Sequence, residues 1–327
     1  MSHLMETMAY AGDVPWHGLG VPVSNDLSPD EMRVAAGVNW EVYKTPDYIK
    51  IPKDWDGSYP KYDYIPSGTW KVCRDDTHEI LTSVSDDWQP TLNEDAFNFF
   101  DDLVRHGGME MHTAGSLMSG AIVWVLAKVK DGFTIFGGDT IESYLLFTNP
   151  HIYGKAIDIR FTPIRVVCNN TLTMALSGKK ADNAVRVSHV AKFDHEQIKE
   201  YLGLAHNKLN EYKEMAEFLG SKQTSPEQII NYFSEVFPLT GKKKGEEVKD
   251  IAELSRPGRL AFNALFEQPG TEFAEGSWWQ PFNASTYVVD HVKGRSADTR
   301  LTSAWYGPGQ VCKMKALQKA IEYAEVA

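Results

Sequence analysis

Between residues 109 and 162, four apolar segments of strand length follow one another. They occupy residues 109–114, 121–129, 143–148 and 155–162, and they are separated by turn-forming residues. The second segment ends in Lys130-Asp131-Gly132, a sequence typical of the tight turn between antiparallel neighbours. Segments this short are better suited to strands than to packed helices. We therefore predict an antiparallel sheet at the centre of the chain.

The residues on both sides of these segments extend the predicted order of elements. Residues 70–73 and 79–84 flank a polar turn and predict a hairpin, and Asn93 is placed to cap a helix at residues 94–106. Residues 166–176 predict a short helix that ends at Gly178, and residues 184–189 a further strand. The predicted order is β-β-α-β-β-β-β-α-β.

The two ends of the chain have different patterns. Residues 1–66 are rich in Pro, Gly, Asp and aromatic residues, and predict an irregular arm with short strands and one short helix after Ser28-Pro29. From Asp194 onwards apolar residues recur at helical spacing, and the last third of the chain is predicted to be helical. We predict an α+β fold, with an arm (residues 1–66), a core (67–192) and a helical region packed on that core (193–327).

Composition favours an ordinary globular protein that needs no cofactor. A chain of 327 residues with 43% hydrophobic residues can bury a large core. Cys73, Cys168 and Cys312 lie far apart in the sequence, which favours a reducing compartment, and no long apolar segment predicts a membrane span. We expect a cytoplasmic protein without a metal. A site formed by His106, Glu110 and His112 is the alternative, but no further ligands complete it.

Charge is distributed unevenly along the chain. The net charge is −11, and residues 1–100 hold 17 acidic against 7 basic side chains. Residues 151–192 hold seven basic side chains against two acidic ones. An anionic partner is therefore expected at the basic segment, although a solvated edge of the sheet would have the same composition.

Within the basic segment, two arginines flank Thr162-Pro163 and precede a stretch of amide and hydroxyl side chains. Guanidinium groups next to a helix start could hold successive phosphates. Alternatively, the polar residues cap the helix and Arg160 pairs with Asp158. The predicted phosphate contacts are Lys155, Arg160, Arg165, Lys179, Lys180 and Arg186, with Asn169, Asn170 and Thr171 as polar supports.

Two further groups of residues are candidates for a functional cluster. Trp16-His17 lies between glycines and could form a ligand-binding turn or a turn fixed by a buried Trp. Helical spacing places Asn283, Tyr287, Asp290 and His291 on one face. This face could be an active site, a DNA-facing surface, or a buried network that joins the last helices to the core through Arg300. Lys313 and Lys315 are expected to be solvated.

Three motifs carry a resemblance to a known family. They are His3-Leu4-Met5-Glu6 with residues 16–20 (WHGLG), residues 165–172 (RVVCNNTL), and residues 283–291 (NASTYVVDH). In this order the motifs resemble the phage/plasmid-like protein family, the domain of unknown function nine-three-two. The resemblance covers nearly the whole chain and implies a protein of prophages, phages or plasmids, working in a bacterial host cell.

A second resemblance concerns architecture. The predicted order of elements in residues 95–176 is similar to the core of the RecT, Erf and Rad-type single-strand annealing proteins. It implies a homo-oligomeric ring or filament that holds single-stranded DNA by its backbone. The alternatives are a factor whose acidic N-terminal third binds a host protein, such as an inhibitor of host defence, and, less favoured, an enzyme that uses Asp290, His291, His17 or Cys168.

Overall fold

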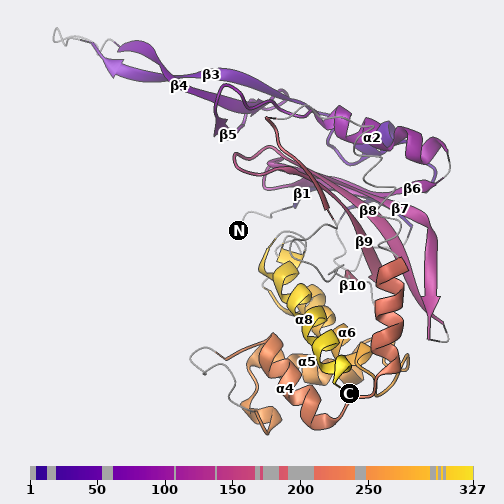
Figure 1. The fold of residues 1–327 in the computed structure, drawn as a ribbon. Coiled ribbons are helices and arrows are strands. Elements are labelled where there is room, and N and C mark those ends of the chain that lie inside the picture. Colours follow the sequence, from indigo (N-terminus) through magenta and orange to yellow (C-terminus); the bar gives the residue numbers. More distant parts are fainter. Residues whose placement is uncertain are drawn as a thin grey trace.

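The computed structural model consists of two β-sheets and a helical C-terminal region (Figure 1). The residues that it describes are 5–12, 20–53, 62–106, 108–136, 138–165, 170–171, 184–190, 210–239, 248–294, 300, 303–304 and 307–326. The α+β class and the antiparallel sheet predicted from the sequence are confirmed.

The larger sheet has the strand order β10-β9-β8-β7-β6-β1-β2, and β11 also pairs with β9. Its neighbours are antiparallel, except that β1 and β2 are parallel. The four predicted central strands are confirmed as β6 to β9, but the turn predicted at Lys130-Asp131-Gly132 is wrong, because β7 continues through these residues with a shift of register and turns after Ile135. The strands are β1 (Met5–Ala11), β2 (Val21–Val23), β6 (Met109–Leu117), β7 (Ile122–Ile135), β8 (Asp139–Pro150), β9 (Ile157–Arg165), β10 (Asn170–Thr171) and β11 (Ala184–Val187).

The smaller sheet contains β3 (Val42–Pro52), β4 (Tyr62–Arg74) and β5 (Ile80–Val84). Its β4–β5 pair is the predicted hairpin. The N-terminal residues are more regular than we expected, because β1 joins the large sheet and β3 pairs with β4 over nearly its whole length. In Figure 1 the β3–β4 pair extends as a long ribbon away from the rest of the molecule.

Helices α1 (Pro29–Ala35) and α2 (Asn93–Arg105) are both expected elements, but the cap of α2 differs from the prediction. Ser28 and Glu31 form a capping box on α1. In α2, Asn93 is inside the helix, and its side chain donates to the carbonyl of Trp40. The carboxylate of Glu41 accepts from the first backbone amides of α2 instead. A distant residue therefore supplies the cap that the local sequence had assigned to Asn93.

The hydrophobic core of this part of the molecule lies between α2 and one face of the large sheet. Phe97, Phe99 and Phe100 of the helix are almost fully buried, and the ring of Phe99 lies 5.5 Å from that of Phe147 on β8. Each buried phenylalanine contributes about 2 to 3 kcal/mol through the hydrophobic effect. This packing fixes α2 on one face of the sheet.

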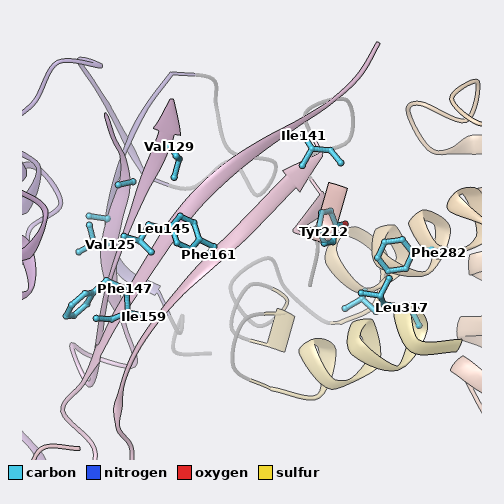
Figure 2. Close-up of a cluster of buried hydrophobic side chains, with 14 of the residues drawn as sticks. Val125, Val129, Ile141, Leu145, Phe147, Ile159, Phe161, Tyr212, Phe282 and Leu317 are labelled. Atoms are coloured by element: carbon cyan, nitrogen blue, oxygen red, sulfur yellow. The ribbon is translucent and has the colours of Figure 1, made fainter. Parts of the chain in front are cut away.

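The helical region packs at the far end of the β7–β8 hairpin. Figure 2 shows Tyr212, Phe282 and Leu317 from this region in one apolar cluster with strand residues such as Ile141. Nε1 of Trp279 donates to the buried carboxylate of Asp139 at 2.9 Å, which joins this region to β8. The helical elements are residues 210–221, α4 (Pro226–Val236), η1 (Ile251–Glu253), α5 (Arg256–Glu267), α6 (Trp279–Tyr287), the π-helical turn η2 (Val288–Val292) and α8 (Pro308–Glu325).

The short helix predicted at residues 166–176 is wrong at the two positions of this segment that the structure describes. Asn170 and Thr171 form β10, which pairs with Arg165 and Ile164 of β9. Backbone pairing with β9 replaces the local hydrogen bonds that a helix would make. The remaining residues of that segment lie outside the described part of the chain. Among the described residues, no helix is both long and apolar enough to cross a membrane.

Candidate nucleic-acid interface

The pairing of β9 with β11 brings three charged side chains of the basic segment together. Arg186 lies directly opposite Asp158 in the register, and Arg160 lies two residues further along β9 on the same face. Nε of Arg160 is 2.5 Å from Oδ1 of Asp158, and Nε of Arg186 is 3.2 Å from Oδ2. One carboxylate therefore binds two guanidinium groups, and this set carries a positive net charge.

The two arginines face different surroundings. The side chain of Arg186 is 63% exposed, whereas that of Arg160 is mostly buried. Arg160 lies near enough to Lys313 of α8 for its positive charge to contribute to lowering the pKa of that lysine. The alternative in which Arg160 pairs with Asp158 is thus confirmed. Arg186 is the member of the pair that reaches solvent.

The turn between β8 and β9 adds an aromatic and a basic side chain at the same end of the sheet. Tyr153 is 62% exposed, and its backbone amide donates to Oγ1 of Thr82 on β5. Lys155 is exposed and lies two residues before Ile157, which pairs with Val187. We call Tyr153, Lys155 and Arg186 the basic-aromatic edge.

The other predicted phosphate contacts are less well defined. The backbones of Arg165, Asn170 and Thr171 are placed in β9 and β10, but their side chains lie outside the described part of the structure. Residues 169, 179 and 180 lie outside it altogether. The assignments of Asn169, Lys179 and Lys180, like those of the three placed residues, stay predictions. Because β10 replaces the predicted helix start, that helix start no longer supports an anion site at Asn170.

The polar face of residues 283–291 lies inside the molecule. Asn283 and Asp290 are each 1% exposed, and Nδ2 of Asn283 donates to the carbonyl of Trp279 one turn earlier. Tyr287 and His291 are partly buried, and their rings stack with centroids 4.7 Å apart. These contacts agree with a buried network. Trp16 and His17, the other half of this predicted cluster, lie outside the described residues.

Asp290 forms an ion pair with Lys313, a lysine that we expected to be solvated. Nζ of Lys313 lies 3.0 Å from Oδ1 of Asp290, and Lys313 is itself 1% exposed. The prediction that Lys313 is solvated is wrong, because α8 turns this position towards the π-helical turn. Burial lowers the pKa of Lys313, and the negative charge of Asp290 opposes that shift. Asp290 is enclosed and paired, which disfavours its use as an acid or base in an open cleft.

A second polar group on the large sheet was not singled out from the sequence. Glu142 of β8 accepts from Nζ of Lys128 and from the hydroxyl of Tyr144, each at 2.5 Å. The ring of His112 on β6 lies 4.9 Å from that of Tyr144. The hydrogen bonds and the charge of Lys128 hold the pKa of Glu142 below its usual value, against the effect of burial. The sequence signal that could have identified this group is the spacing of Glu142 and Tyr144, which lie two residues apart on one strand and so share a face.

The predicted alternative of a metal site is not supported by the described side chains. Glu110 lies 3.7 Å from Nζ of Lys130, and Nδ1 of His106 lies 2.7 Å from the carbonyl of Asp102. His112 faces Tyr144 instead. Within the described part of the chain, no three His, Cys, Asp or Glu side chains form a group that could hold a metal ion.

Comparison with known proteins identifies one related family. A family model described as a domain of unknown function, DUF932, matches residues 80–305. This range includes β5 to β11, the basic-aromatic edge and the buried Asp290. No curated protein and no solved structure matches the chain.

Proposed function

The chain belongs to the DUF932 family, and from this premise we propose that it binds single-stranded DNA at the basic-aromatic edge. The observation that carries the proposal is that an exposed aromatic ring, Tyr153, and two exposed cations, Lys155 and Arg186, lie at the same end of the sheet. Proteins that hold single strands combine these two features, since bases stack on aromatic rings and cations follow the phosphates.

The electrostatics of the edge support binding of phosphate. Lys155 forms no ion pair with any described residue, and Arg186 shares its carboxylate with Arg160. A phosphate can approach Arg186 from solvent without displacing Asp158, because most of the Arg186 side chain is exposed. Because the whole chain carries a net charge of −11, most of its surface would repel DNA, and binding is expected only at a local basic surface.

The biological setting that we propose is annealing of DNA during recombination or replication of a phage or another mobile element. The protein would act in the cytoplasm of the bacterial host, as a homo-oligomeric ring or filament. The annealing role, the bacterial host and the ring or filament are taken from the two family resemblances of the sequence. The basic-aromatic edge supplies the contact surface that such a role needs.

The test is fluorescence anisotropy with a labelled single-stranded oligonucleotide across a salt series. The double variant Lys155→Ala/Arg186→Ala should bind at least tenfold more weakly than the unchanged protein. The slope of log K against log salt should become shallower by about 1.4, since roughly 0.7 counterions are released per phosphate contact on a single strand. Tyr153→Ser should weaken binding without changing this slope, because stacking is not ionic.

The matched control is Arg105→Ala/Lys213→Ala, which removes the same charges from two exposed positions elsewhere. An equal loss of affinity in this control would show that binding is not located at the edge. If no binding occurs at low salt, the proposal is wrong. The second candidate, a factor that binds a protein partner, would then lead, because the β3–β4 ribbon exposes apolar side chains.

A further inference from the structure

The β3–β4 ribbon is only two strands wide over its outer half. The third strand, β5, pairs with β4 at residues 70–73, close to the body of the protein. From Tyr48 to Pro52, β3 is paired with β4 alone. In Figure 1 this outer half projects well beyond the large sheet and the helices. Isolated two-stranded ribbons are marginally stable in water, so packing of another protein surface against one face would stabilise this ribbon.

The strand register divides the outer ribbon into two chemically different faces. Ile49 lies opposite Ile65, and Ile51 lies opposite Asp63. Because directly opposed side chains share a face and successive residues alternate, these residues form one face. We call Ile49, Ile51 and Ile65 the isoleucine face. The other face presents Tyr48, Tyr62 and Tyr64, with Nζ of Lys50 lying 3.6 Å from the ring centroid of Tyr62.

Of the two faces, the isoleucine face would gain more free energy from burial against another surface. Ile49, Ile51 and Ile65 are 52%, 36% and 45% exposed. Tyrosine has a hydroxyl group that water can satisfy, whereas isoleucine gains only from leaving water. Full burial of one isoleucine contributes about 1.5 to 3 kcal/mol. Three neighbouring isoleucines on a projecting ribbon are therefore a contact surface for protein.

The charges around this face suit a second copy of the same chain. Asp63 is the charged side chain on the face, and Nζ of Lys53 in the same ribbon lies 3.1 Å from its Oδ1. The surface is therefore neutral and apolar. It can meet an identical surface without repulsion, although the whole chain carries −11. A strongly acidic or basic partner would gain nothing from it.

The free edges of the ribbon are poorly suited to strand addition. Over the outer half both strands have a free edge: β3 contains Pro46 and Pro52, and β4 contains Pro66, none of which has an amide hydrogen to donate. At the base, Nζ of Lys44 donates to the carbonyl of Trp88 at 3.1 Å, which ties the ribbon to the body of the protein. Because prolines interrupt both edges of the outer half, contact through a face is favoured over contact through an edge.

We propose that the isoleucine faces of two copies pack against each other and form a two-fold symmetric dimer. The two ribbons then make a small two-layer sandwich, in which each copy contributes the same residues. Such a contact closes on itself and joins two copies only. The inference rests on other residues than the DNA-binding proposal: the outer half of the ribbon shares no residue with the basic-aromatic edge, although Tyr153 of that edge donates to Thr82 on β5.

The test is analytical ultracentrifugation of the full chain over a range of concentrations. In the absence of DNA the unchanged protein should show a monomer–dimer equilibrium, and the proposed ring or filament would assemble from such dimers. Ile49→Lys and Ile49→Asp should each weaken the dimer at least tenfold, because like charges then meet across the two-fold axis. Tyr64→Ser, on the opposite face of the same ribbon, is the matched control and should leave the dimer unchanged. Circular dichroism checks that each variant is folded.

Mixing the two charged variants makes the test specific for contact between ribbons. An equimolar mixture of the Ile49→Lys and Ile49→Asp proteins should restore the dimer, since opposite charges then face each other. Failure of the mixture to restore it would overturn the proposal, because the ribbon would then meet another part of the second copy. A wild-type protein that stays monomeric, or a dimer that survives both variants, would also overturn it.

Discussion

Asp290 and Lys313 form a buried ion pair in which Oδ1 and Nζ are 3.0 Å apart and each side chain is 1% exposed. The pair connects the π-helical turn η2 with α8, which are 23 residues apart at this contact. A buried charge that loses its partner is costly, whereas the intact pair contributes little net stability. The connection therefore specifies how α8 packs more than it strengthens the fold.

Replacing Lys313 by methionine should lower the free energy of unfolding by about 3 kcal/mol, because the buried carboxylate of Asp290 loses the cation that lies 3.0 Å away. Adding Asp290→Leu in the double variant should recover most of the loss. Urea denaturation measures both. Lys315→Met, on the same helix but partly exposed, is the control. An equal loss in Lys315→Met would contradict the argument.

Acid should destabilise the protein from about pH 6.5 downwards through His151. Burial, with help from the charges of His189 and Arg74, lowers the pKa of His151 from 6.5 to about 3. Between these values the unfolded chain binds a proton that the folded protein does not, so stability falls as the pH falls. The slope is at most about 1.4 kcal/mol per pH unit for this group. Burial shifts the pKa of His189 in the same direction.

The variant His151→Gln tests this pH dependence. It keeps a donor for Oδ1 of Asn93, which lies 3.0 Å from Nε2 of His151, and removes the titrating group. Urea denaturation between pH 3 and 7 gives the free energy of unfolding as a function of pH. In the variant this free energy should fall less steeply on the acid side, by the equivalent of about one bound proton. The exposed His106→Gln serves as the reference. Identical acid limbs in the His151→Gln variant and the unchanged protein would show that other groups control the acid response.

Glu41→Ala should destabilise the protein by about 1 to 2 kcal/mol, as loss of a helix cap does. Its carboxylate oxygens accept from the backbone amides of Asn93 and Glu94 at 2.6 and 2.8 Å. Thermal unfolding monitored by circular dichroism would measure the effect. Glu94→Ala removes an exposed carboxylate from the same turn and should cost less. A larger effect of Glu94→Ala would place the cap elsewhere.

Gly220→Ala should be destabilising by about 1 to 3 kcal/mol, since a Cβ at this position would overlap the ring of Phe136. The cause is steric, so Phe136→Leu should reduce the additional cost of Gly220→Ala. A double-mutant cycle from urea denaturation gives the coupling between the two positions. Additive effects would show that the ring moves aside without cost.

Arg160 and Arg186 should behave differently although both bind Asp158. Arg160→Ala should lower the free energy of unfolding, because the mostly buried Asp158 loses its closer partner. Arg186→Ala should leave stability nearly unchanged, since its side chain is largely in solvent. Urea denaturation of both single variants checks this. If the order of the two losses were reversed, Arg186 would be the structural residue, and the basic-aromatic edge would lose a contact.

The elements that the sequence predicts well are those whose pattern is complete within one segment. The strands β6 to β9, the helix α2 and the helical character of the last third of the chain are confirmed, because strand-length apolar segments and helical spacing depend on neighbours in the chain. The helix predicted across Asn170 and Thr171 failed because β9 offered them backbone partners. Local preference cannot anticipate a strand that lies elsewhere.

The candidate sites show the same division. The sequence identified the basic segment and the polar face around Asp290, because both depend on residue type and spacing. The tertiary structure decided which arginine is exposed, that Lys313 pairs with Asp290, and that Tyr153 and Arg186 lie at the same end of the sheet. Burial and charge pairing join residues that are distant in the chain. The sequence by itself determined the kinds of elements, and only the packing of those elements decided which side chains meet.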